Sequence, residues 1–230
     1  RPPTVTDVVI SHGPIVRGRK TVIEAGELRF PHGSVIGLIG GNGAAKTTLL
    51  MGIAGLLTRQ PDMDVGGNSG HGVGYLDQHP ALPAWLTARE VFRLYSVGDE
   101  LLERLESFGM KQHFDRRVGT LSPGQRQLLG ALLILTLNCP LTLLDEPLSA
   151  LDMQRRRQLL ELIRDRRLSR DNCATLLSSQ VPADLYETCD YFVVIRVGSY
   201  AFLGSKAEFL PPGGGSLQDF EARALALMGS

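Results

Sequence analysis

Hydrophobic positions change their spacing along the chain, and each change predicts a different element. Between residues 4 and 30, short β-branched pieces are separated by polar positions, which is typical of antiparallel strands joined by turns. Residues 34–39 are largely apolar, as expected for a strand buried on both faces. After the glycines that follow, one apolar helical face predicts a helix over residues 46–57: Leu49, Leu50, Ile53, Leu56 and Leu57.

The second half of the chain alternates apolar runs with amphipathic stretches. "LTLLD" (141–145) and "ATLLSS" (174–179) have the composition of buried strands, and residues 153–167 between them are helical in pattern. Such alternation predicts a parallel sheet with helices on both faces. Residues 191–204 predict a hairpin that turns at Gly198-Ser199, and an apolar stripe predicts a last helix over 217–227.

Three stretches do not fit the alternation. Residues 58–74 are rich in Gly, Asp and Asn, which indicates a connecting loop or hairpin rather than a second phosphate loop, because no Lys-Thr helix start follows. Residues 83–119 are helical and charged, with amphipathic segments at 88–97 and 99–110, so we expect a helical insertion. The apolar run 128–137 has ten residues, whereas a spanning helix needs about 20, and it predicts a buried helix.

Composition narrows the function classes. The chain has 230 residues, enough for one large domain or a core with a small subdomain. Its 24 basic and 24 acidic residues cancel, so no global charge favours nucleic acid as a partner. Cys139, Cys173 and Cys189 are odd in number and lack metal-ligand spacing, which favours a reduced, intracellular setting. The arginine-rich stretch 153–170 is interpreted as a solvated helix face in preference to a lipid or partner contact.

The glycine-rich stretch "GGNGAAKTT" has the spacing of a phosphate-binding loop. Backbone N–H groups and a helix N-terminus would face phosphate oxygens, Lys46 would reach the terminal phosphates, and the Thr47 hydroxyl would ligate magnesium. The strict pattern has glycine at position 45, where this chain has alanine. If that position needs a positive φ, Ala45 costs on the order of 1 kcal/mol, which is a penalty and not a prohibition.

Two further polar stretches suit nucleotide chemistry. Asp145 ends an apolar strand and could hold magnesium through water, while Glu146 could polarise an attacking water, although an acidic pair at a strand end is often a solvated sheet edge. In "LSPGQRQ", Ser122 and the helix N-terminus offer a second anion site or simply a helix N-cap.

In their order along the chain, these motifs and two more resemble those of the ATP-binding cassette (ABC) ATPases of membrane transporters, and the resemblance covers almost the whole chain. The glycine loop is similar to Walker A, "YLDQ" to the glutamine loop, "LSPGQ" to the signature, "LTLLDEP" to Walker B with its catalytic glutamate, and "SALD" to the D-loop. The resemblance implies an α/β fold with a P-loop NTPase core, a mostly parallel sheet, an N-terminal antiparallel β element and an inserted helical subdomain. One domain is then expected over 1–230, with its core at about 1–79 and 135–210, the helical subdomain at 80–134, and a linker and helix at 211–230.

The resemblance also implies an ATPase that uses ATP and Mg²⁺ and drives a separate transmembrane permease from the cytoplasmic face of the membrane. Such domains pair head to tail with a second ABC domain, as homodimers or heterodimers. The implied catalytic residues are Glu146 and Gln180, and the implied metal ligands are Thr47, Gln78 and Asp145. The implied nucleotide-binding residues are Gly40, Gly41, Asn42, Gly43, Ala44, Ala45, Lys46, Thr47, Thr48, Gln78, Ser122, Gly124 and Gln125.

The chain departs from the family pattern at several positions. Besides Ala45, Gln180 stands where the family has a histidine that contacts the γ-phosphate, and Pro123 replaces a signature glycine. Before the glycine loop Phe30 is the only aromatic residue, so Ile15, Val16 or His12 would have to cover the base. The alternative function is therefore a degenerate domain that binds ATP in a structural or regulatory role. The short helical insertion and the signature stretch resemble those of exporter domains slightly more than those of importers. Trp85, which follows the glutamine loop, is interpreted as either an interface anchor or a core residue.

Overall fold

A six-stranded sheet forms the centre of the computed structural model, which describes residues 7–17, 19–57, 63–66, 72–95, 106–137, 139–169 and 173–229. The strand order is β11-β10-β5-β9-β8-β7, and all neighbours are parallel except the edge strand β11. The strands are β5 (Val35–Gly40), β7 (Val73–Leu76), β8 (Leu141–Leu144), β9 (Ala174–Ser178), β10 (Tyr191–Arg196) and β11 (Ser199–Ser205). This order confirms the predicted mostly parallel sheet.

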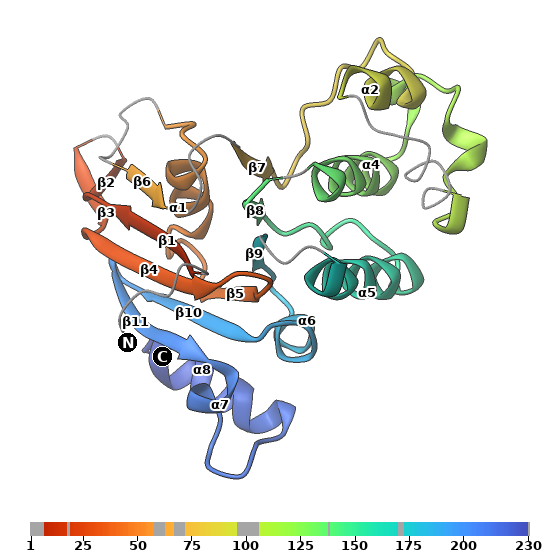
Figure 1. Cartoon of the computed structure of the whole chain (residues 1–230). Coiled ribbons are helices and arrows are strands. Elements are labelled where there is room, and N and C mark those ends of the chain that lie inside the picture. The colour runs from red at the N-terminus through yellow and green to blue at the C-terminus, as the bar shows by residue number, and fades with distance from the viewer. Residues whose placement is uncertain are drawn as a thin grey trace.

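Antiparallel strands form the N-terminal element, as predicted (Figure 1). One sheet has the order β4-β1-β6, and β2 pairs with β3. Their bounds are β1 (Asp7–His12), β2 (Ile15–Arg17), β3 (Lys20–Ile23), β4 (Gly26–Pro31) and β6 (Met63–Gly66). Strand β6 lies inside the stretch predicted as a loop or hairpin, most of which falls outside the described residues.

Helices cover both faces of the large sheet. The α-helices are α1 (Lys46–Ile53), α2 (Ala88–Leu94), α4 (Pro123–Thr136), α5 (Met153–Ser169), α6 (Pro182–Thr188), α7 (Lys206–Phe209) and α8 (Leu217–Met228), with short 3-10 turns η1 (Lys111–His113) and η2 (Val118–Thr120). Side chains of β5 alternate between two cores: Ile36 and Leu38 pack with α1 and the antiparallel strands, while Val35 and Ile39 pack with α4, α5 and α8. The double burial explains why this strand is apolar on both faces.

The predicted helical insertion is present in part. In Figure 1, α2 lies beyond α4, away from the sheet, and its Phe92 packs against Phe114 with ring centroids 6.1 Å apart. The amphipathic segment predicted at 99–110 lies largely outside the described residues, and the domain boundaries stay a prediction. Trp85 is 73% exposed, so the core interpretation of this residue was wrong. None of the helices in the described ranges combines the length and hydrophobicity needed to span a bilayer.

Two predicted element ends were wrong. Helix α1 stops at Ile53 because Gly55, with φ of 72°, ends it in a left-handed conformation, and Leu56 is left 54% exposed. The hairpin between β10 and β11 turns at Val197-Gly198, one residue earlier than predicted, with φ of 33° and 83° at these two positions.

Candidate functional site

The glycine loop joins the end of β5 to the start of α1. Lys46 opens the helix, and its ammonium donates to the carbonyl oxygens of Gly40 at 2.6 Å and Gly41 at 3.3 Å. Burial lowers the pKa of Lys46, and the nearby carboxylates of Glu146 and Asp145 oppose that shift. The lysine is therefore half-buried at the loop, within electrostatic reach of both acidic residues. Thr47 lies in the first turn of α1 and is exposed.

Ala45 has a backbone conformation that favours glycine. It is the N-cap of α1, with φ of 71° and ψ of 25°. This confirms the condition under which its methyl group costs on the order of 1 kcal/mol. Among the described non-glycine residues only Ala45, Glu146 and Val197 have positive φ, and two of these three carry the predicted nucleotide chemistry.

Asp145 supplies a buried carboxylate within electrostatic reach of Lys46. It is 1% exposed, its Oδ1 accepts from the Ser178 hydroxyl at 2.8 Å, and its N–H donates to Leu76 at 2.9 Å. Its Oδ2 is buried and has no hydrogen-bond partner among the described residues. A buried carboxylate oxygen without a partner suits a hard cation such as Mg²⁺, either directly or through water.

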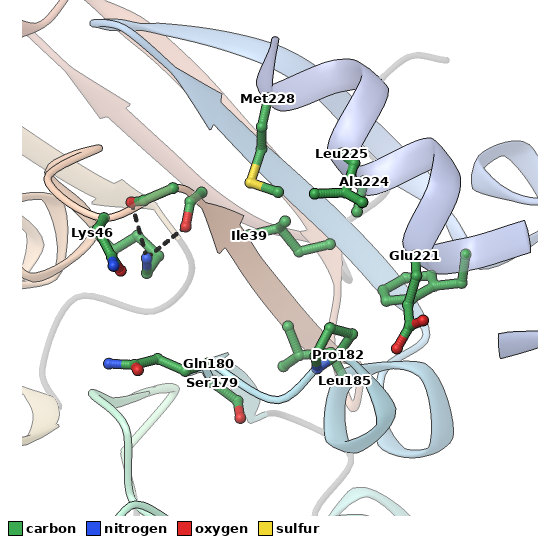
Figure 2. Close-up of a pocket in the computed structure, with 14 residues that line it drawn as sticks. Ile39, Lys46, Ser179, Gln180, Pro182, Leu185, Glu221, Ala224, Leu225 and Met228 are labelled. Carbon is green, nitrogen blue, oxygen red and sulfur yellow. Dashed lines mark hydrogen bonds between the residues drawn. The ribbon is translucent and has the colours of Figure 1, made fainter. Parts of the chain in front are cut away.

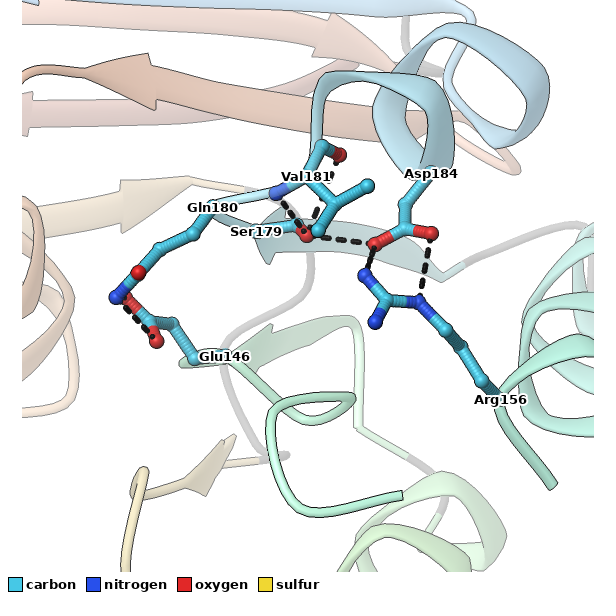
Figure 3. Close-up of polar contacts among 6 residues, drawn as sticks. All are labelled: Glu146, Arg156, Ser179, Gln180, Val181 and Asp184. Atoms are coloured by element: carbon cyan, nitrogen blue, oxygen red, sulfur yellow. Dashed lines mark hydrogen bonds and ion pairs between the residues drawn. The ribbon is translucent and has the colours of Figure 1, made fainter. Parts of the chain in front are cut away.

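Glu146 is held by side chains from the two neighbouring strand ends. Gln78 follows β7 and donates to Glu146 Oε2 at 3.1 Å. Gln180 follows β9 and donates to Oε1 at 2.8 Å and Oε2 at 2.9 Å (Figure 3). The Glu146 N–H also donates to Ser178 Oγ at 2.9 Å. Because β7, β8 and β9 are adjacent and parallel, their carboxyl ends bring these predicted site residues together.

The segment that carries Gln180 is anchored by a network that the sequence did not reveal. Ser179 donates to Asp184 Oδ2 at 2.7 Å, and Arg156 from α5 donates to Asp184 Oδ1 at 2.9 Å and pairs with Oδ2 as well (Figure 3). The hydrogen bonds that Arg156 donates to Asp184 raise the pKa of Arg156. The only sequence signals were an aspartate just after Pro182 and an arginine run on the preceding helix.

The signature stretch begins helix α4. Ser122 Oγ accepts from the Gln125 N–H at 3.2 Å, and Gln125 Oε1 accepts from the Ser122 N–H at 2.9 Å, so the predicted N-cap is present. An added Cβ at Gly124 would lie 2.4 Å from the Ala150 carbonyl oxygen, which ties this turn to the "SALD" stretch. Among the described residues, neither Ser122 nor Gln125 forms a hydrogen bond with the glycine loop.

Two cavities flank the glycine loop. The first, of about 450 Å³, contains Lys46, Ser179 and Gln180 and is walled by α6 and α8 (Figure 2). The second, of about 330 Å³, lies between β3 and the turn that joins β10 to β11. His12 and Ile15 are buried, at 5% and 0% exposure, and neither lines this second cavity. Val16 is not part of the lining either, and coverage of the base by His12, Ile15 or Val16 stays a prediction.

Comparisons with known proteins agree with this geometry. The family model described as ABC transporter matches residues 23–149. The chain is 32% identical to the uncharacterized ABC transporter ATP-binding protein YxlF of Bacillus subtilis over 75% of this chain and 62% of that protein. It is 30% identical to the ABC transporter ATP-binding protein NatA of the same organism over 77% of this chain and 79% of that protein.

Two further matches differ in extent. The mouse retinal-specific phospholipid-transporting ATPase ABCA4 is 31% identical over 75% of this chain, which spans only 8% of that protein. A solved structure of the ATP binding subunit of an ABC transporter shares the fold, with a TM-score of 0.75 at 24% identity, covering 96% of this chain and 95% of that one. The family match covers more than half of this chain, from the last residue of β3 to the first residue of the D-loop stretch, and the chain therefore belongs to the ABC transporter family as one of its ATP-binding domains.

Proposed function

We propose that this chain binds Mg-ATP at the glycine loop and hydrolyses it with Glu146 as general base, to power transport through a separate transmembrane permease. One observation carries the proposal. The Glu146 carboxylate is held by amides from two neighbouring strand ends, next to an aspartate whose buried Oδ2 has no partner among the described residues.

Different residues of the site would bind the phosphates and the Mg²⁺ ion. The N–H groups at the start of α1 and the Lys46 ammonium would face the phosphates, as expected for a helix that follows a glycine loop. Asp145 Oδ2, the Thr47 hydroxyl and the Gln78 side chain at the neighbouring strand end would hold Mg²⁺. When bound, this ion neutralises charge that develops on the phosphates. Asp145 stays fixed because Ser178 donates to its other oxygen.

Glu146 has one carboxylate oxygen that is better placed to take a proton. Oε2 accepts from both Gln78 and Gln180, whereas Oε1 accepts from Gln180 alone among the described residues. A carboxylate offers about four acceptor sites, so Oε1 keeps room for a water molecule. We assign Oε1 as the atom that removes the proton from the attacking water.

The second candidate function is ATP binding with little turnover. Ala45 strains the loop, and Gln180 cannot carry a proton or a positive charge. Both features favour a structural or regulatory domain, whereas the retained Glu146 favours hydrolysis.

A single set of purified variants tests both candidates. Lys46→Ala should abolish ATP-dependent thermal stabilisation, while Lys111→Ala, a lysine of the helical insertion, should keep it. Glu146→Gln should bind ATP, stop phosphate release and trap a dimer in light scattering. Full stabilisation of Lys46→Ala would refute the binding site. Wild-type protein that binds ATP but releases no phosphate, even with its permease, would favour the regulatory role.

The proposed permease contact has a built-in reporter. Trp85, the only tryptophan, is 73% exposed between Gln78 and α2, and Leu94 at the end of α2 is 66% exposed. Exposed aromatic anchors are typical of protein interfaces. The fluorescence of Trp85 should shift to shorter wavelength when the permease binds at the cytoplasmic membrane face. Trp85→Ala should weaken that binding without lowering the stability of the free domain. An unchanged emission spectrum in a purified complex would place the contact elsewhere.

A further inference from the structure

The second cavity beside the glycine loop is lined by three segments of the chain and by Met228, with no aromatic side chain among the described residues. It is formed by the glycine loop, by β3 residues and by the turn at Val197-Gly198, and its volume is about 330 Å³. That volume is within the range of small-ligand pockets. Two of its side chains are cationic, Lys20 and Arg196.

The positions of the two cavities indicate which part of a nucleotide each would receive. Both are lined by Gly41 and Asn42, so a phosphate chain lying along the loop passes between them. The first cavity contains Lys46 and Gln180, and Gln180 holds the proposed general base. The terminal phosphate therefore belongs at that end. The nucleoside must leave the loop on the other side, in the second cavity.

Two features place Arg196 beside this second cavity: its position in β10 and the packing of its guanidinium against Gly229. It ends β10 directly after Ile195, which is in register with Gly40 at the start of the loop. Its guanidinium also lies against Gly229, where an added Cβ would be 2.8 Å from Nε and 2.9 Å from Cζ. Gly229 is the C-cap of α8, with φ of 75°. The C-terminal end of a helix carries partial negative charge, which favours a cation at this place.

We propose that Arg196 covers the nucleobase of ATP, with its guanidinium stacked on the base in place of an aromatic ring. A guanidinium is planar and weakly hydrated, and it stacks on aromatic faces, whereas the Lys20 ammonium is a compact, strongly hydrated charge. Helix α8 is then a positioning element, because its glycine cap leaves the space that the guanidinium occupies. This inference rests on the proposed function.

Calorimetric titration with ATP and with tripolyphosphate, which lacks a base, tests the assignment. Arg196→Ala should weaken ATP binding about tenfold, within the range of one base stack, and leave tripolyphosphate binding unchanged. Arg196→Lys keeps the charge but should lose as much as Ala, and Arg196→Tyr should restore ATP binding. Arg157→Ala, an exposed arginine of α5, is the matched control and should bind both ligands like wild type.

Each contrary result has one meaning. Equal losses of ATP and tripolyphosphate affinity in Arg196→Ala would make Arg196 a phosphate contact, and full ATP affinity in that variant would place the base elsewhere. Either result overturns the assignment while leaving ATP binding intact. The proposed function itself fails if wild-type protein binds neither ligand, or if Lys46→Ala binds both as tightly as wild type. Arg196 is exposed, so equal unfolding temperatures for the variants are the check that folding is preserved.

Discussion

The Gln180 side-chain amide donates to both carboxylate oxygens of Glu146, at 2.8 and 2.9 Å. The two residues follow adjacent parallel strands, β9 and β8, so the sheet itself sets their separation. A neutral amide can orient a carboxylate, but it brings no proton and no positive charge to a phosphate. The site therefore has a positioned base without a titratable group at position 180.

We expect Gln180→His to raise the basal rate of phosphate release. An imidazole can donate to Glu146 or to the terminal phosphate and can also carry a positive charge. The gain should be about tenfold or more, since one donor to a developing oxyanion is worth about 10²–10³ in rate. Gln180→Ala should lower the rate, because Glu146 then loses its anchor. A rate in Gln180→His no higher than in Gln180→Ala would contradict the role given to this position.

Ala45→Gly should increase both stability and ATP affinity. At φ of 71° the methyl group costs on the order of 1 kcal/mol, which glycine would recover. For a chain of this size the unfolding temperature should rise by about 2–4 °C. Differential scanning fluorimetry with and without ATP measures both effects.

The neighbouring alanine supplies the matched control for Ala45→Gly. Ala44 is in the same loop but is not among the positive-φ residues, so Ala44→Gly recovers no strain and should lower stability. An equal change in the two variants would show that backbone strain at position 45 is not the cause.

The outcome for the fold shows which features local sequence encodes. The resemblance to ABC ATPases assigned Gln78, Asp145, Glu146 and Gln180 to one site, and the structure shows why they meet: each follows one of three adjacent parallel strands, whose carboxyl ends lie together. Hydrogen bonds now join Gln78 and Gln180 to Glu146, and Ser178 joins Glu146 to Asp145.

Other features of the structure depend on long-range contacts or on single backbone conformations, which the spacing of hydrophobic residues does not reveal. The Arg156–Asp184 pair joins residues 28 positions apart, and neither residue has a motif that marks its partner. Val197 adopts a positive φ that β-branched residues rarely adopt, so the turn was assigned to the next pair of residues. The end of α1 was missed because Leu56 and Leu57 continue the apolar pattern beyond Gly55, where the backbone turns out of the helix.

Asp184→Ala should destabilise the domain far more than the loss of an exposed ion pair on α5, the helix that carries its partner Arg156. Asp184 is 6% exposed and accepts from Arg156 and Ser179, so its removal leaves a guanidinium partly buried without its carboxylate. We expect a loss of about 2 kcal/mol or more in the free energy of unfolding. Glu161→Ala removes the exposed Arg157–Glu161 pair of α5 and should cost about 0.5 kcal/mol or less. Urea unfolding compares the two variants, and similar urea midpoints for Asp184→Ala and Glu161→Ala would refute a structural role for the buried Arg156–Asp184 pair.

The free energy of unfolding should decrease as the pH is lowered, because of a hydrogen bond between Gln125 and His113 in the signature region. Gln125 donates from Nε2 to His113 Nε2 at 2.9 Å, and its Oε1 is occupied by the Ser122 N–H, which fixes the amide orientation. His113 Nε2 must therefore be an unprotonated acceptor. Burial lowers the pKa of His113, and the positive charges of Arg116 and Arg155 lower it further.

The sign of the pH effect follows from that lowered pKa. As pH falls below about 6.5, the unfolded chain takes up a proton on His113 before the folded domain does, so the free energy of unfolding decreases. The decrease ends once pH is below the pKa of the folded state, where both forms are protonated. His113→Gln keeps an acceptor for Gln125 but cannot titrate, so its stability should depend less on pH over this interval. Urea unfolding at a series of pH values measures the difference, and equal slopes in wild type and variant would show that the His113 contact does not control it.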